Sequence, residues 1–424
     1  MPIIQQKLQN KAYVKAEPIA SAKTVAIGFW FSAGSRFESE GKHGISHFVE
    51  HMIFKGTKNR SCFDIACEFD KMGGYINAFT EREQLCLYCV IPSQYCVQAI
   101  NIMGDMIYNS TFDASEIEKE RHVIQSEILS SLDDPEEVAL DAVFSSVWKN
   151  NPISWSIAGT TVDVDSLTRE DLVNWYEDYI RKGSLLVTLS GNFSEKETFE
   201  ALNNFPDREN FDLVRILERP RWNSEFSFVK AFFQQEQFFY LFPLSLPLSY
   251  EKNICYAILN AIIGDTMSSR LFQKLREESG YCYNVYSFFN VFSDCGFWAF
   301  YATSSKENSL KVVQDMKTIV DDFLKNDISE EEIDFAKQHL CGEEIMASED
   351  VEQRMKGLAR SYFAGYESIE IDQVLELIRN TSHEDLKNVL EEVRNSFENA
   401  FVVYGPPLKN SVEKSIEQAV KNGN

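Results

Sequence analysis

The chain has 424 residues, of which 44% are hydrophobic and 25% are charged. This composition is typical of a folded globular protein and excludes a largely disordered chain, and the length favours two or more domains. The formal net charge of -24 would repel phosphate backbones, so we expect no nucleic-acid partner. The acidity predicts either plain solubility or a surface that attracts basic peptides.

The sequence gives no sign of a membrane or secreted protein. It contains no run of 18 apolar residues, and its first 20 residues lack the apolar region of a signal peptide. The nine cysteines are an odd number scattered from Cys62 to Cys341, which favours thiols in a reducing compartment. Cys86 and Cys89 have CxxC spacing, but their apolar, strand-like context predicts buried strand cysteines. We therefore expect a cytoplasmic protein without a membrane partner.

The first half of the chain reads as strands alternating with groups of helices. Hydrophobic periodicity and capping signals predict elements in this order: a strand at 24–33, helices at 44–55 and 62–72, strands at 75–80 and 84–91, helices at 94–108, 114–132, 136–148 and 169–180, a strand at 185–191, and a helix after Ser194.

Three of the six histidines lie in the stretch HGISHFVEHMIFKG, residues 43–56. On a helix, the residues Ile45, Phe48, Val49, Met52 and Ile53 form one apolar arc. His47, Glu50 and His51 group on the opposite side, where two imidazoles four residues apart can face one metal ion. His43 precedes Gly44 at the expected helix start, and we interpret it as an exposed histidine that binds no metal.

A catalytic zinc site usually has three protein ligands, so a further donor is required. The helix predicted at 114–132 offers four carboxylates, and Glu120 and Glu127 are seven residues apart on one face. Spacing alone does not choose among Glu116, Glu118, Glu120 and Glu127. His122 points to another face of the same helix, and we exclude it as a ligand.

The second half repeats the first at an offset of 214 residues. Thr168–Asn174 matches Ser382–Asn388, Asp113–Glu116 matches Asp327–Glu330, and Gly191 matches Gly405. The predicted elements of this half are strands at 226–233, 237–243, 282–292, 296–304 and 400–405, with helices at 249–263, 268–278, 308–325, 330–365 and 383–394, and a polar tail after Pro407 that is a loose helix or disordered.

These repeats predict an α+β fold of two duplicated domains, each a mostly antiparallel sheet flanked by helices. We expect a first domain at 1–205, a linker at 206–223 and a second domain at 224–424. The offset places Ala261, Gly264 and Asp265 opposite the histidine motif, and Cys341 opposite Glu127. No HxxEH occurs in the second half, which therefore cannot repeat the metal site and is expected to bind substrate.

The ordered motifs resemble those of the pitrilysin family of zinc peptidases, the inverzincins, whose HxxEH reverses the commoner HExxH. Within this family the chain resembles the half-length bacterial members similar to the catalytic subunit of the mitochondrial processing peptidase. The resemblance covers nearly the whole chain through the segments AGSRFE, GISHFVEHMIFKGTKNRS, MGGYINAFTERE, IEKERHVIQSEI, LSSLDDPEE and MSSRLFQKLREESGYCYNVYS. The family's early Leu-x-Asn-Gly reads Leu8-Gln-Asn10-Lys11 here, so the usual glycine of the first turn is missing. GDTM is a poor substitute for the glycine-rich loop of the processing peptidase, so we do not expect presequence processing as such.

The resemblance implies roles for individual residues in the first half. It implies one Zn²⁺ per chain held by His47, His51 and Glu127, with Glu50 as general base and Glu120 as a catalytic-site residue that supports the ligands. It also implies that Asn77 and Ala78 bind substrate on an edge strand, which an extended peptide can join through main-chain hydrogen bonds.

The resemblance also assigns substrate binding to Arg276 and Tyr283 in the second half. It implies half of a clam-like chamber per chain and therefore a dimer, a homodimer in the simplest case, with a heterodimer as the alternative. The predicted function is a zinc endopeptidase for short or unfolded peptides. The rival hypotheses are a non-proteolytic scaffold or partner-activating subunit, and a soluble α+β protein with fortuitous histidines.

Overall fold

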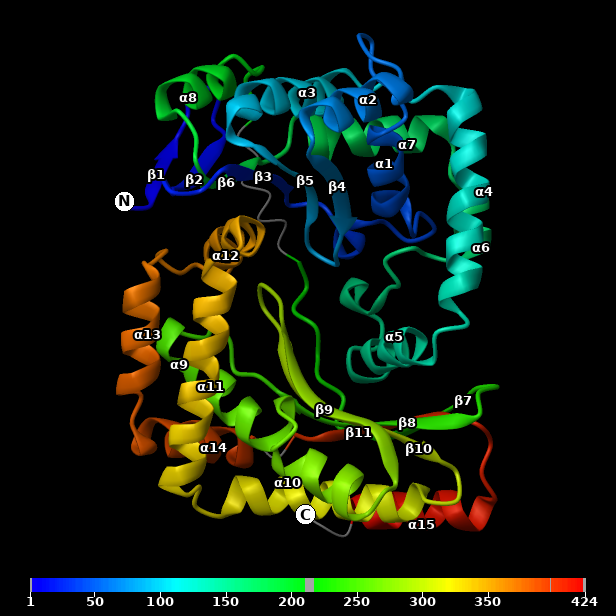
Figure 1. The fold of residues 1–424 in the computed structure, drawn as a ribbon. Coiled ribbons are helices and arrows are strands. Elements are labelled where there is room, and N and C mark those ends of the chain that lie inside the picture. The colour runs from blue at the N-terminus through cyan, green and yellow to red at the C-terminus, as the bar shows by residue number, and fades with distance from the viewer. Residues whose placement is uncertain (1, 210–216, 397, 422–424) are drawn as a thin grey trace. The chain divides into compact units, whose positions relative to one another are not determined.

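Two β-sheets, each with its own set of helices, organise the chain in the computed structural model, which describes residues 2–209, 217–396 and 398–421 (Figure 1). The first compact unit combines Met1–Asp133, Pro152–Glu218 and Ala347–Glu370. The second combines Asp134–Asn151, Arg219–Met346 and Ile371–Asn424. The predicted α+β class with two similar, mostly antiparallel sheets is confirmed.

The first sheet has six strands in the order β1-β2-β6-β3-β5-β4, and only β2 and β6 pair in parallel. Its strands are β1 (Ile4–Lys7), β2 (Tyr13–Pro18), β3 (Thr24–Phe31), β4 (Tyr75–Thr80), β5 (Leu85–Pro92) and β6 (Leu186–Gly191). Strands β3, β5 and β6 are almost continuously buried because both of their faces are covered by helices. The main helices of this unit are α1 (Ile45–Ile53), α2 (Cys62–Met72), α3 (Cys96–Asn109), α4 (Ala114–Ser131), α6 (Thr161–Ser166), α7 (Arg169–Trp175), α8 (Glu195–Asn203) and α12 (Val351–Phe363).

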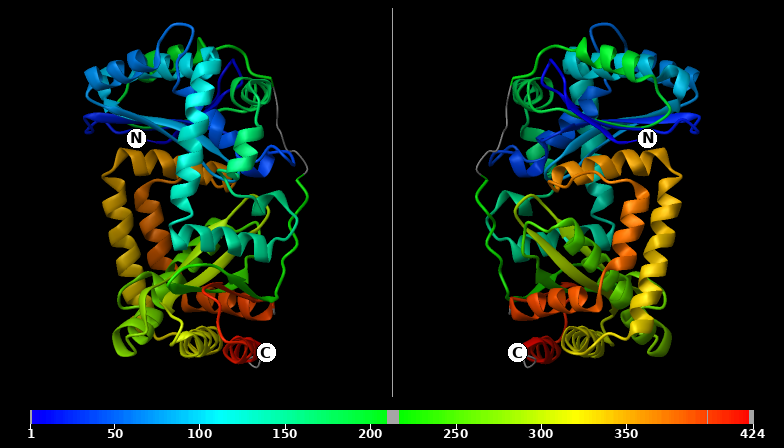
Figure 2. Two further views of the ribbon diagram at one scale, coloured as in Figure 1. Left: turned by 90° about the vertical axis from the view of Figure 1, so that its right-hand side faces the viewer. Right: turned by 90° about the vertical axis from the view of Figure 1, so that its left-hand side faces the viewer.

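The second sheet has five strands in the order β7-β11-β8-β10-β9, and its one parallel pair is β7 with β11. Its strands are β7 (Phe226–Lys230), β8 (Gln235–Pro243), β9 (Cys282–Val291), β10 (Gly296–Ser305) and β11 (Ala400–Gly405). Helices α10 and α15 lie side by side beneath this sheet in the views of Figures 1 and 2. The main helices of the second unit are α5 (Pro135–Val147), α9 (Tyr250–Asn260), α10 (Ser309–Lys325), α11 (Glu330–Ser348), α13 (Ile371–Asn380), α14 (His383–Asn395) and α15 (Asn410–Lys421).

One helix from each half of the chain packs on the sheet of the other half. Helix α5 follows the first-unit helix α4 but packs on β8 and β11 of the second sheet. Helix α12 follows α11 but packs on β2, β3 and β6 of the first sheet. The second residue of each helix is a glutamate that accepts a hydrogen bond from a tyrosine hydroxyl of an edge strand. These pairs are Tyr286 with Glu136 and Tyr75 with Glu352.

A glycine allows the close approach of α12 to the first sheet. A Cβ at Gly28 of β3 would lie 2.5 Å from Met355 Sδ and 2.6 Å from Trp30 Nε1. Met355 and Ala359 are fully buried in a cluster with Trp30, Cys86 and other residues of this face. Cys86 and Cys89 are both buried in β5, as predicted, and burial raises the pKa of both thiols.

Several element boundaries differ from those expected from the sequence. The helix predicted at 330–365 is two helices, because α11 ends at Ser348 and the Asp350 side chain caps the start of α12. Strands β1 and β2 and helix α13 were not predicted, and the tail after Pro407 forms α15. The linker predicted at 206–223 lies partly outside the described residues, which omit 210–216. The predicted domain limits stay predictions, although the compact units exchange helices across them.

None of the described helices is long and apolar enough to cross a membrane. A cytoplasmic location stays a prediction from the sequence.

In the turn before β2, Lys11 stands where the sequence comparison expected a glycine, and its backbone conformation leads to a stability prediction. Lys11 has φ +70°, a left-handed conformation that costs an L-residue about 1–2 kcal/mol. Its N–H donates to Leu8 O at 3.0 Å, which closes the turn. We expect Lys11→Gly to raise the free energy of unfolding by about 0.5–1 kcal/mol, since relief of strain exceeds the entropic cost of glycine.

Urea denaturation of wild type, Lys11→Gly and Lys11→Ala checks this prediction. The alanine variant keeps a Cβ and should gain nothing. An equal gain in both variants would mean that the strain at this turn is not the cause.

Candidate metal centre

Helix α1 presents an apolar face to the core and a polar face to a second helix. Phe48, Val49 and Met52 are at most 1% exposed, as the periodicity predicted. The residue at the N-cap of the helix is Gly44, whose φ is +81° and which has no side chain to cap the free N–H groups. The buried carboxylate of Glu38 replaces that cap, since it accepts hydrogen bonds from Gly44 N at 2.9 Å and Ser46 N at 3.0 Å.

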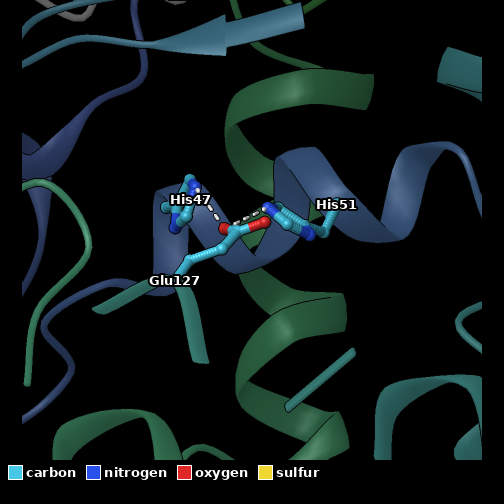
Figure 3. Close-up of side chains that lie close together, drawn as sticks. All are labelled: His47, His51 and Glu127. Carbon is cyan, nitrogen blue, oxygen red and sulfur yellow. Dashed lines mark ion pairs between the residues drawn. The ribbon is translucent and has the colours of Figure 1, made fainter. Parts of the chain in front are cut away.

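Helix α4 supplies the carboxylates that face α1. The Asp113 side chain caps its start, and Ile124 and Ile128 anchor it in the core. Glu127 Oε2 lies 3.4 Å from His51 Nε2 and 3.8 Å from His47 Nε2 (Figure 3). The structure therefore brings together the two histidines and the glutamate that were expected to bind zinc.

These three side chains fit a zinc ion. Their donor atoms all lie within 4.8 Å of one another, and they form the one group of His, Cys, Asp and Glu in the described part of the chain that could hold a metal. A tetrahedral zinc ion with bonds of about 2.1 Å places neighbouring donors roughly 3.4 Å apart. Two imidazole nitrogens and one carboxylate oxygen are also a common ligand set of catalytic zinc.

The surroundings favour the neutral form of His47 and orient the ring of His51. Burial, followed by the neighbouring His51, lowers the pKa of His47 to about 4, so its imidazole is neutral at physiological pH. Glu120 is 5% exposed and its Oε2 lies 3.0 Å from His51 Nδ1. An Nδ1–H that donates to this carboxylate would leave Nε2, which lies on the side of Glu127, free to bind a metal ion.

Glu50 lies on the same face of α1 and is placed by the first sheet. Thr80 Oγ1, at the end of edge strand β4, donates a hydrogen bond to Glu50 Oε2 at 2.5 Å. Burial raises the pKa of Glu50, and the Thr80 hydrogen bond partly offsets this increase. A carboxylate with a raised pKa is suited to general-base chemistry near neutral pH.

His43, which precedes α1, and His122 of α4 lie outside the metal group. His43 packs against Trp155 with ring centroids 4.3 Å apart, so the expectation that it is exposed is wrong. His43 is covered because the segment that contains Trp155 and Ala158 lies against the start of α1. The approach is so close that a Cβ at Gly44 would lie 2.4 Å from Ala158 O. His122 is exposed on α4, and neither residue belongs to the metal group.

The predicted substrate-binding residues lie in two separate places. Asn77 and Ala78 are on β4, an edge strand of the first sheet, and Ala78 N donates to Asn77 Oδ1 at 2.9 Å. In the second unit, the Arg276 guanidinium lies 4.9 Å from the Tyr283 ring and donates to Tyr283 O at 2.9 Å. Tyr283 is 72% exposed.

The second unit does not repeat the metal group at the positions that correspond in the 214-residue repeat. Gly264 stands opposite Glu50 in the 214-residue repeat, and a Cβ there would lie 2.4 Å from Ser287 Oγ. Ser287 instead donates to Asn260 Oδ1 at 2.7 Å, and Trp298 Nε1 donates to the same oxygen at 2.8 Å. A buried structural hydrogen-bond network fills this site, and Cys341 opposite Glu127 is buried.

A duplicated α+β fold with an HxxEH helix facing a glutamate helix defines a class of candidate metal-dependent hydrolases. Two family profiles match, "Insulinase (Peptidase family M16)" over residues 13–161 and "Peptidase M16 inactive domain" over residues 166–340. The chain belongs to peptidase family M16, which confirms the family predicted from the sequence.

Individual relatives agree with this assignment. The chain is 31% identical to an uncharacterized zinc protease of Rickettsia felis, over 94% of this chain and 97% of that protein. It is 29% identical to an uncharacterized zinc protease of Bacillus subtilis, over 82% and 85% of the two chains. The crystal structure of a peptidase M16 inactive domain from Pseudomonas fluorescens has the same fold, with a TM-score of 0.87, 16% identity and coverage of 96% and 99%.

Proposed function

We propose that this protein is a zinc endopeptidase that hydrolyses short or unfolded peptides. The observation that carries the proposal is the meeting of His47, His51 and Glu127 within 4.8 Å, with Glu50 on the same helix face. The names of the Rickettsia and Bacillus relatives support zinc and proteolysis.

Each residue of the site has a role in this proposal. His47 and His51 offer Nε2 and Glu127 offers a carboxylate oxygen to the ion, which would act as a Lewis acid and lower the pKa of a water molecule. Glu50 accepts the proton of that water as the peptide carbonyl is attacked and then delivers it to the leaving amine. Glu120 holds the ring of His51 in the binding orientation.

Edge strand β4 supports a peptide as the substrate. It is the last strand of the first sheet and pairs with β5 alone among the described strands, and Thr80 on this strand contacts the proposed general base Glu50. We propose that an extended peptide pairs with β4 near Asn77 and Ala78 and that Arg276 and Tyr283 hold a peptide carbonyl.

Metal analysis together with peptide cleavage tests the proposed function. The purified protein should bind about one zinc ion per chain and cleave an unstructured peptide, and a chelator should abolish cleavage until zinc is restored. A protein that binds zinc but cleaves none of a diverse set of unfolded peptides would favour the non-proteolytic subunit. A protein that binds no zinc would overturn the proposal.

The hydrogen bond from Thr80 leads to a prediction about pH. It stabilises the Glu50 carboxylate and lowers its pKa, so its loss in Thr80→Val should raise that pKa. The acid limb of the kcat/KM profile should then move to higher pH, by roughly one unit, with activity recovering at higher pH. Thr80→Ser keeps the hydroxyl and should retain the wild-type profile, and a Thr80→Val profile that matches wild type would contradict the assignment of Glu50 as the titrating base.

We also propose that the active form is a dimer in which each zinc site uses Arg276 and Tyr283 of the other copy. Mixing inactive Glu50→Gln chains with inactive Arg276→Ala chains tests this arrangement. Recovered hydrolysis would show that residues from two chains serve one site, whereas a mixture that stays inactive despite subunit exchange would argue against it.

A further inference from the structure

Lys55 contacts the carboxylate that supports a proposed metal ligand. Its Nζ lies 2.6 Å from Glu120 Oε1, while the other oxygen of Glu120 lies 3.0 Å from His51 Nδ1. The opposite nitrogen of the same imidazole, Nε2, lies 3.4 Å from Glu127 Oε2. A continuous series of polar contacts therefore leads from Lys55 to the metal group.

The end of α1 places Lys55 on the side of the helix that carries His51. Phe54 N donates to His51 O and Lys55 N donates to Met52 O, so the chain makes one more turn after Ile53. Gly56, with φ +105°, then redirects the backbone. Lys55 is four residues after His51, and residues at this spacing share a helix face.

Burial makes the contact more consequential than an exposed ion pair. The Glu120 side chain is 7% exposed and that of Lys55 is 25% exposed, whereas exposed pairs contribute little. A carboxylate so buried needs a cation or hydrogen-bond donors. Lys55 is the one Lys or Arg that forms a salt bridge with Glu120 among the described residues.

We propose that Lys55 is a positioning residue for metal binding. It holds Glu120 against His51 Nδ1 and so fixes the imidazole with Nε2 directed at the metal. The proposal rests on the proposed zinc site but adds a residue outside the HxxEH and glutamate motifs. Lys55 acts through Glu120 and does not contact the ion or the substrate.

Zinc affinity of the full-length protein tests this role. Competition with a chromophoric chelator should give a zinc dissociation constant about 10-fold higher for Lys55→Met than for wild type, since loss of a supporting partner typically costs 10- to 100-fold. Lys55→Arg keeps a cation and should lie between the two. Lys58→Met alters an exposed lysine three residues away and should match wild type.

Two further measurements separate positioning from a general loss of structure. With cobalt at saturation, the visible absorption of Lys55→Met should differ from that of wild type because the ligand orientation has changed. In the Glu120→Ala background, Lys55→Met should weaken zinc binding by less than 2-fold, because position 120 then has no side-chain oxygen for Lys55 to hold.

The outcomes distinguish this inference from the proposed function. Lys55→Met with wild-type zinc affinity, or with an undiminished effect in the Glu120→Ala background, would overturn the role of Lys55 and leave the zinc peptidase proposal intact. A wild-type protein that binds no zinc would overturn the proposed function itself.

Discussion

Replacing Glu50 by glutamine should lower peptide hydrolysis by about 100- to 10,000-fold, the usual contribution of a general base, while zinc stays bound. Glutamine has nearly the same shape and can still accept the Thr80 hydrogen bond through its carbonyl oxygen, but it cannot take up a proton. Glu50 is not one of the three grouped donors, so bound zinc should remain at about one ion per chain.

Steady-state kinetics and metal analysis on the same preparation check this result. Glu40→Gln is a matched control, because Glu40 is an exposed glutamate shortly before α1 and should not affect the rate. A fully active Glu50→Gln variant would remove Glu50 from the mechanism even if zinc binding is as proposed.

Replacing Glu127 by glutamine should abolish stable zinc binding and, with it, hydrolysis. The neutral amide is a poor zinc ligand, so two imidazoles alone would hold the ion. We expect zinc affinity to fall by more than about 100-fold, beyond the effect of losing a supporting residue. Excess zinc should restore little activity, because the carboxylate also sets the geometry of the site.

Glu118→Gln is the control for this variant, since Glu118 lies on the same helix and pairs with Arg121 away from the metal group. It should keep both zinc and activity. If Glu127→Gln retains zinc after dialysis against a chelator, while Glu118→Gln or another carboxylate variant of α4 loses it, the third ligand has been misassigned.

The sequence predicted the fold class well because its strongest signals are local and repeated. The 214-residue offset relates β6 to β11 and α7 to α14, and both pairs lie in equivalent positions of their sheets and units. The exchange of α5 and α12 could not be predicted, because periodicity shows that a helix has an apolar face but not which sheet it covers. The break at Asp350 was missed although the residue is a good N-cap, since apolar residues continue on both sides of it.

The site was predictable from the sequence only in part. Helical periodicity placed His47, Glu50 and His51 on one face, and the structure shows that face directed at α4. Spacing could not decide whether Glu120 or Glu127 is the third donor. The distances distinguish them, because Glu120 contacts Nδ1 of His51 whereas Glu127 lies near Nε2 of both histidines.

The supporting residues gave no comparable signal. Thr80 appears as an ordinary strand residue, and its contact with Glu50 depends on packing between a sheet and a helix 30 residues apart in sequence. A distant carboxylate cap for α1 could have been expected, since Gly44 offers no capping side chain. That Glu38 supplies it depends on the conformation of the loop between the two residues, which the sequence does not reveal.

Zinc-edge anomalous diffraction from crystals of the full-length protein grown with zinc tests the central claim most directly. The account predicts one anomalous peak per chain in the first unit, about 2.0–2.2 Å from His47 Nε2, His51 Nε2 and a Glu127 oxygen. A protein saturated with zinc that shows no peak between α1 and α4, or that holds its ion on other residues, would contradict it.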